Sequence, residues 1–159
     1  LFSSVVDNFE TYLSDLLYEI FLAYPETLKS QQTVTIEEVL NWSDLQDFIK
    51  FWAKQKIGKL QKGSVRGFIK DTKQISDLQV LDKKEQNKIE NILQIRHLYA
   101  HRNGIVDEKF LQFFTGEFTI GTEHQMSINN IFEKFDYLSA VVDRIDISAI
   151  NKYKLSQSN

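Results

Sequence analysis

The sequence of 159 residues contains no cysteine, which excludes a disulfide scaffold, a thiolate metal site and a cysteine nucleophile. Proline occurs once, at Pro25, and glycine only six times, so long helices can run with few breaks. The longest apolar run is Ile20 to Tyr24, whereas a membrane-spanning helix needs about 20 apolar residues. We therefore expect no membrane partner and a cytoplasmic location, which the absence of cysteine also suits.

Composition is that of a globular protein, with 42% hydrophobic and 26% charged residues. A chain of this length can bury roughly two-thirds of the surface that it exposes when unfolded. The sequence has no Pro-rich linker and no repeat of solenoid period. We therefore expect one helical domain over residues 1–153 and a loose tail over residues 154–159.

Apolar residues recur at three-to-four spacing in four long segments, which predicts four amphipathic helices. These segments are about Ser3 to Tyr24, Ser43 to near Gly63, Lys83 to Arg102, and a last helix that follows Ser127. Short helices are expected over Ile36 to Leu40, Ser64 to Thr72 and Glu108 to Phe114, and an extended stretch over Gly116 to Gly121. The predicted fold class is all-α, four long helices in a bundle with short accessory helices.

Capping residues predict where several of these helices begin and end. Capping boxes are expected at Ser43 with Gln46 and at Asp82 with Glu85, and serine caps at Ser64 and Ser127. The pair Asn103-Gly104 suits a left-handed helix stop. On the last helix, the expected inner face is Ile128, Ile131, Phe132, Phe135, Leu138, Val142, Ile145 and Ala149.

An arginine interrupts the apolar side of the helix at 83–102. A wheel at about 100° per residue gives this helix a core stripe. The stripe consists of Ile89, Ile92, Leu93 and Ala100. Arg96 falls near its centre, where an unpaired guanidinium would cost several kcal/mol. One interpretation is therefore structural: Arg96 pairs with a carboxylate such as Glu10 or Asp15, and the nearby histidines lie on the surface.

The flank of the same helix carries a polar ridge. The ridge consists of Glu90, Gln94, His97 and His101. His97 and His101 have the spacing of a two-histidine metal site, but no acidic residue completes a recognised ligand pattern, so no metal is expected. Ile95 and Leu98 are apolar on the far side, which predicts that a second subunit covers this helix.

Positive charge is concentrated between Lys50 and Lys73, where seven lysines and one arginine stand against one aspartate. This local charge of plus 7 contrasts with the net charge of minus 3 of the whole chain. The segment is either a solvated helix face or a surface that grips RNA phosphates. The candidate RNA-binding residues are Lys59, Lys62, Arg66 and, after the histidines, Arg102.

The run R-H-L-Y-A-H-R-N-G-I-V-D, from Arg96 to Asp107, resembles the signature of the HEPN superfamily, in particular its RiboL-PSP branch. That signature is an arginine, a polar residue directly after it, and a histidine at the end of a helix, as in Arg96, His97 and His101. Three further stretches resemble the branch: Phe9-Glu10, Gly63 to Phe68, and the I-V-D-E-K-F run after the motif. One departure is Arg102, where members often have asparagine.

The resemblance implies an all-α bundle that forms a homodimer through the motif helix, and a metal-independent endoribonuclease without a cofactor. The 2′-hydroxyl of the RNA would attack the phosphate, with His101 in acid-base work and Arg96 on the phosphate. His97 would position one of them or share proton transfer. Such an enzyme would be a toxin or defence effector, with RNA and an antitoxin protein as partners.

The alternative is a non-catalytic RNA-binding or protein-interaction HEPN module of a larger protein. The first residue, Leu1, is not methionine, which favours this alternative, whereas the intact Arg96 and His101 favour the enzyme. Other enzyme classes are disfavoured because the chain has no G-x-S-x-G elbow, no P-loop and no dinucleotide-binding fingerprint.

Overall fold

A computed structural model describes residues 1–62 and 64–155, and within them the chain is all-α, as predicted. The helices are α1 (Phe2–Ala23), the 3-10 turn η1 (Pro25–Leu28), α2 (Ile36–Leu40), α3 (Leu45–Leu60), α4 (Val65–Asp71), α5 (Lys73–Ser76), α6 (Lys83–Arg102), α7 (Glu108–Leu111) and α8 (Ile128–Tyr153). The described residues contain no strand, only one isolated antiparallel bridge between Ile105 and Glu123. The four long helices are α1, α3, α6 and α8.

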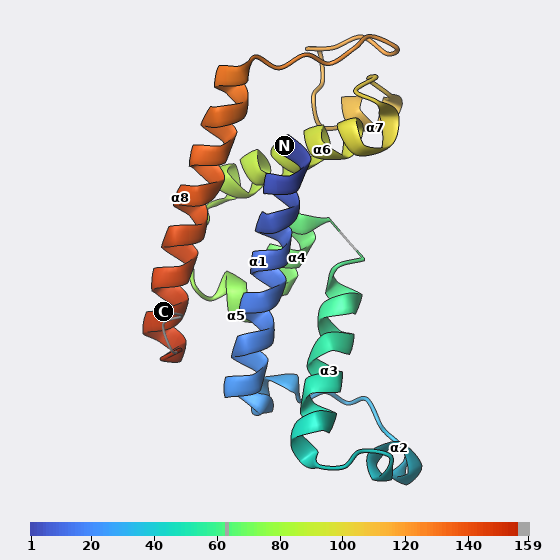
Figure 1. The fold of residues 1–159 in the computed structure, drawn as a ribbon, viewed down its shortest axis with the longest axis vertical. Helices are drawn as coiled ribbons and strands as arrows, with labels where there is room; N and C mark the ends of the chain where they lie inside the picture. Colours follow the sequence, from blue (N-terminus) through green and yellow to red (C-terminus); the bar gives the residue numbers. More distant parts are fainter. Residues whose placement is uncertain (63, 156–159) are drawn as a thin grey trace.

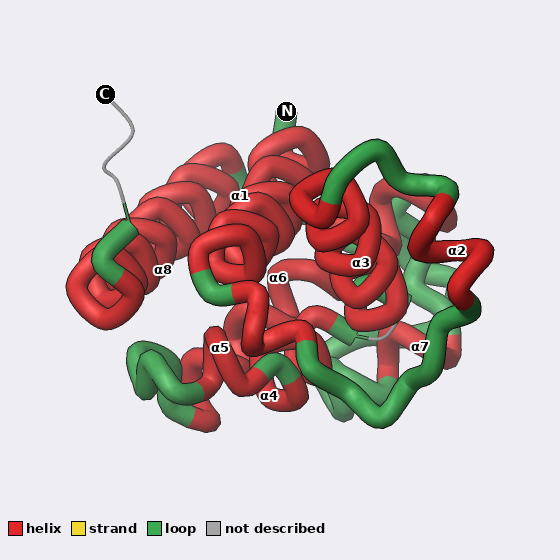
Figure 2. Tube along the Cα trace, turned by 90° about the horizontal axis from the view of Figure 1, so that it is seen from below, coloured by secondary structure: helices red, strands yellow, loops and turns green. Residues whose placement is uncertain are grey.

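Helix α1 occupies the centre and packs against α3, α6 and α8 (Figure 1). Its apolar residues supply the largest share of one buried cluster: Phe2, Val6, Phe9, Leu13, Leu16, Leu17, Ile20 and Phe21. The short helices α4 and α5 cover the remaining side, with α4 packed on α6 (Figure 2). The N-terminal half of α1 therefore lies beside the helix that carries the HEPN-like motif.

Several predicted helix ends are confirmed. Asp82 and Glu85 form a reciprocal capping box at the start of α6, and Ser64 and Ser127 cap α4 and α8 through their side chains. Asn103 ends α6 in the left-handed region, with φ of 51°. These ends follow from local hydrogen bonding, which explains why the sequence alone predicted them.

Other predicted boundaries are wrong. Asp44, rather than Ser43 with Gln46, caps α3, because its carboxylate accepts the backbone N–H of Asp47. Helix α3 ends at Leu60, and the expected end near Gly63 lies outside the described residues. The short helix α5, which directly follows α4, was not predicted. The stretch 116–121 is turned rather than extended, with positive φ at both of its glycines.

The prediction of which residues of α6 are buried was only partly right. Ile89, Ile92 and Leu93 are buried as expected, but Ala100 is exposed. Ile95 and Leu98, expected to face a second subunit, are only 5% and 2% exposed within this one chain. Intramolecular packing therefore replaces the subunit interface as the reason for their apolar character.

The segment after α6 covers Leu98, which lines one small cavity together with Asp107, Lys109 and Phe110. It folds back over the end of α6 and is pinned by backbone bonds from Val106 N–H to Thr122 and from His124 N–H to Gly104. A cluster of rings fills the space beneath it: Phe110, Phe114, Phe118 and His124. Tyr99 of α6 donates a hydrogen bond to the carbonyl of His124 at 2.6 Å, so the fold-back is tied to the motif helix.

The buried face of α8 is shorter than the predicted inner face. Leu138, Ile145 and Ala149 are buried, but Ile128 and Phe132 are largely exposed. The first turns of α8 reach beyond the helices that could cover them (Figure 1). At the other end, Lys154 takes a left-handed conformation and Leu155 is half-buried against the core, while the rest of the predicted tail lies outside the described residues.

Candidate functional site

The three predicted catalytic residues lie in the last turns of α6. The capping box at Asp82 fixes where this helix begins, and the left-handed Asn103 fixes where it ends. Arg96, His97 and His101 therefore have a defined position, directly before the fold-back that leads to α7.

The two histidines form a pair. The ring centroids of His97 and His101 are 4.5 Å apart and the rings are inclined by 55°. His97 is half-buried, whereas His101 is exposed. The rings lie side by side because the two residues are one helical turn apart, and both imidazoles can contact one small anionic group.

His97 is held towards its neutral form. Burial lowers the pKa of His97, and the positive charges of Lys109, His101 and Arg96 lower it further, while Asp107 opposes the shift. A neutral imidazole can accept a proton at neutral pH. Arg96, His101 and Lys109 therefore lie close enough to His97 for their charges to act on it.

Lys109 was missed as a site residue by sequence reasoning. It belongs to α7, and only the fold-back after α6 brings it close to His97. A signal was present, because Lys109 is part of the I-V-D-E-K-F run that resembles the HEPN branch.

Arg96 points towards α1 and forms an ion pair with Asp7. The predicted pairing with a structural carboxylate is therefore confirmed, but the partner is Asp7 and not Glu10 or Asp15; Glu10 lies one helical turn from Asp7 and within reach of the charge of Arg96. The Arg96 side chain is 25% exposed, and its Nε is buried without a hydrogen-bond partner among the described residues. Asp7 thus orients the guanidinium but uses only part of its five N–H donors.

Glu90, the first residue of the polar ridge of α6, is buried and hydrogen-bonded. Glu90 is 4% exposed, and its carboxylate accepts the backbone N–H of Arg66 at 3.0 Å and the side-chain amide of Gln94 at 2.7 Å. The predicted ridge thus connects α4, through Glu90 and Gln94, with the histidine pair. The anchoring role of Glu90 was not predicted, because its partner lies on another element.

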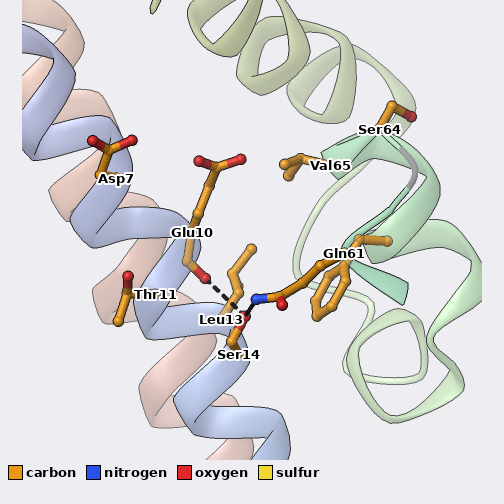
Figure 3. A pocket seen from close by; sticks show the side chains of 9 residues that line it. Asp7, Glu10, Thr11, Leu13, Ser14, Gln61, Ser64 and Val65 are labelled. Atoms are coloured by element: carbon orange, nitrogen blue, oxygen red, sulfur yellow. Dashed lines mark hydrogen bonds between the residues drawn. The ribbon is translucent and has the colours of Figure 1, made fainter. Parts of the chain in front are cut away.

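A cavity of about 340 Å³ lies next to Arg96, between α1, the end of α3 and α4. It is lined by Asp7, Glu10, Thr11, Leu13, Ser14, Gln61, Ser64, Val65 and Phe68. Figure 3 shows the Glu10 carboxyl group pointing into it. Burial raises the pKa of Glu10. The positive charge of Arg96 opposes this shift, and the negative charges of Asp7 and Glu90 add to it. The polar part of the cavity therefore consists of two carboxyl groups, three hydroxyls and one amide, and its Asp7 is also the partner of Arg96.

The structure separates the predicted RNA-binding residues into three places. Lys62 and Arg66 are exposed and flank in sequence the residues 64–65 that line the cavity. Arg102 lies beyond the histidines and pairs with Asp107 at 3.1 Å. Lys59 faces another way, because its Nζ donates to Gln32 at 3.4 Å. Lys62, Arg66 and Arg102 thus adjoin the candidate site, and Lys59 does not.

No three histidine, aspartate or glutamate side chains in the described ranges converge as metal ligands would. In the same ranges, no helix combines the length and apolarity that crossing a bilayer requires. Comparison of the chain with models of protein families, with curated proteins and with solved structures found no match.

Proposed function

We propose that this protein is a metal-independent endoribonuclease whose active groups are Arg96, His97 and His101. The observation that carries the proposal is the pairing of two imidazole rings, with centroids 4.5 Å apart, within electrostatic reach of one guanidinium. The resemblance of this run to the HEPN signature supports the same reaction.

The reaction needs two proton transfers of opposite direction. One histidine takes the proton from the 2′-hydroxyl as its oxygen bonds to phosphorus, and the other protonates the 5′-oxygen as the phosphorus–oxygen bond breaks. The lowered pKa of His97 suits the base, which leaves His101 as the acid. Arg96, oriented by Asp7, stabilises the negative charge on the phosphate oxygens.

The substrate would pass along the exposed side of α6. Lys62 and Arg66 would attract the phosphate backbone, and the cavity beside Arg96 is large enough for a nucleotide base. Because the cavity presents carboxyl and hydroxyl groups, it suits the amino edge of a base better than a phosphate.

The partners that belong to this proposal are RNA in the cytoplasm, a second copy of the chain and, in a toxin or defence system, an antitoxin protein. Since Ile95 and Leu98 are buried within the chain, a second copy at the motif helix would meet its exposed side. That side carries Ala100, His101 and Arg102.

One observation favours the non-catalytic alternative. The ion pair with Asp7 gives Arg96 a structural partner, which would be sufficient reason for an arginine between α1 and α6. In that case the protein would bind RNA or another protein without cleaving RNA.

The deciding experiment compares the wild type with His101→Ala on a labelled RNA pool in excess chelator. The exposed His101 can be truncated without disturbing the core, so stability and RNA affinity stay near wild type while cleavage falls by a factor of about 10² to 10⁴. The products of the wild type should end in a 2′,3′-cyclic phosphate.

The matched control is Gln112→Ala, an exposed truncation just beyond α7 that should retain activity. Equal cleavage by wild type and His101→Ala, in preparations free of contaminating nuclease, would refute the catalytic assignment. RNA binding without cleavage by the wild type would establish the non-catalytic alternative.

A further inference from the structure

An apolar arm stands away from the bundle at the end opposite to the motif. The arm consists of residues 31–45, including α2, and every residue from 29 to 41 is exposed. Figure 1 shows α2 beside the start of α3, far from α6 and α7. The exposed fractions of Ile36, Leu40 and Leu45 are 79%, 75% and 68%.

Helix α2 itself has little packing support, although the arm is attached to α3 through Trp42, whose ring centroid lies 4.9 Å from that of Phe51, and through the hydrogen bond from Lys59 to Gln32. Helix α2 has five residues, and its contacts with the other helices are sparse. A helix this short is marginal in water unless tertiary packing supports it. Ile36, Val39 and Leu40 share one side of the helix by their three-to-four spacing, so the exposed surface is an organised apolar face.

A groove next to the arm is also largely apolar. Its volume is about 270 Å³, and it is lined by Pro25, Leu28, Lys29, Ser30, Gln32, Val34, Leu45, Phe48, Ile49 and Trp52. A smaller cavity of about 180 Å³ continues it past Trp52 towards Lys56 and Lys59. The groove thus has an apolar and aromatic floor with lysines along its edge.

The arm is negatively charged, whereas the edge of the groove is positively charged. Glu37 and Glu38 lie in the first turn of α2, beside the apolar face, whereas Lys29 and Lys59 border the groove. Arm and groove are therefore complementary in both polarity and charge. Val34 and Leu45, at the two ends of the arm, themselves line the groove, so α2 stands beside its own groove and not in it.

We propose that the arm of one copy docks into the groove of a second copy, and the reverse, around a two-fold axis. A self-complementary exchange of this kind forms a closed dimer. Arm and groove together provide roughly 20 residues a side, the usual size of a stable interface. Because this surface is remote from the motif helix, the inference does not depend on the nuclease proposal.

The test begins with sedimentation of the wild type and of Leu40→Glu at micromolar concentration. Both should give the same helical circular dichroism, because Leu40 is exposed. Leu40→Glu should raise the dissociation constant at the arm at least tenfold and halve the sedimenting mass. The matched control is Ile147→Glu, an apolar position on α8 that is also largely exposed and that should leave the mass unchanged.

Direct contact can be tested by cross-linking, since the chain has no cysteine of its own. Leu40→Cys and Lys29→Cys chains, mixed and oxidised, should form a disulfide between copies, and Ile147→Cys with Lys29→Cys should not. Glu37→Lys alone should weaken association, and Lys29→Glu in the same chain should restore it. A monomeric wild type, or a dimer that Leu40→Glu and the cross-link leave unaffected, would overturn the proposal.

Discussion

His97 and His124 titrate according to what surrounds them. Burial lowers the pKa of both, and the charge of Lys134 adds to the effect at His124. His124 is almost fully buried, with its Nδ1 3.0 Å from the Tyr99 hydroxyl. The fold therefore favours the neutral imidazole at both positions.

These shifts predict that mild acid destabilises the protein. Because the folded pKa values lie below the unfolded value of about 6.5, the unfolded chain binds more protons, and stability falls as the pH drops from 6.5 through the folded pKa values. Each histidine contributes at most about 1.4 kcal/mol per pH unit. Urea unfolding between about pH 7 and pH 5 should show this slope, and His124→Gln should reduce it. An unchanged slope in that variant would show that other groups cause the acid sensitivity.

At the scale of helices, the ion pair between Arg96 and Asp7 connects α6 with α1. A double-mutant cycle with Arg96→Met and Asp7→Asn should give a coupling free energy of about 1 kcal/mol, because both side chains are partly exposed. The measurement is urea unfolding of the four proteins. As a control, Arg96→Met with Asp15→Asn, an exposed position elsewhere on α1, should show no coupling.

The sequence predicted the helices and many of their ends, but not every side of each helix. The caps at Asp82 and Ser64 depend on residues three positions away, so they are visible locally. Which side of α6 is covered depends on residues 104–124 folding back, and this made Ala100 exposed and Leu98 buried. The apolar Ile95 and Leu98 indicated that this side is covered, but helical periodicity does not show whether the cover belongs to the same chain or to a second copy.

The same limit applies to the candidate site. Arg96, His97 and His101 share one helix, so their proximity followed from spacing. Asp7 and Lys109 come from α1 and α7, and their approach depends on how the helices pack. The sequence therefore predicted that the candidate catalytic residues lie close together, but not which residues of α1 and α7 approach them.

Burial of Leu98 gives a prediction that separates packing from a subunit contact. Leu98→Ala should lower the free energy of unfolding by about 2–5 kcal/mol, because it leaves a cavity under the fold-back. Ala100→Glu, on the exposed side of α6, should change it by less than about 0.5 kcal/mol. Denaturant titration measures both. A stable Leu98→Ala variant that fails to self-associate would instead place Leu98 in a subunit interface.

Across the whole molecule, the apolar, acidic arm and the basic residues beside the cavity lie in different places. The arm with Glu37 and Glu38 lies at one end of the chain's longest axis, and the end of α6 with its histidines lies towards the other (Figure 1). Lys62 and Arg66 lie between these ends, next to the cavity. Under the two proposals, a second copy at the arm would therefore stay bound while RNA occupies the motif.

RNA affinity should depend on where positive charge is removed, and not only on how much. Replacing Lys62 and Arg66 with glutamine should weaken binding of single-stranded RNA roughly tenfold at 0.1 M salt and reduce the slope of log K against log salt by about 1.4, since two phosphate contacts are lost. Replacing Lys83 and Lys84, exposed in the first turn of α6 and remote from the cavity, removes the same charge and should change affinity much less. Fluorescence anisotropy at several salt concentrations measures both. Equal losses in the two double variants would mean that RNA responds to net charge alone, and the face beside the cavity would then not be the binding surface.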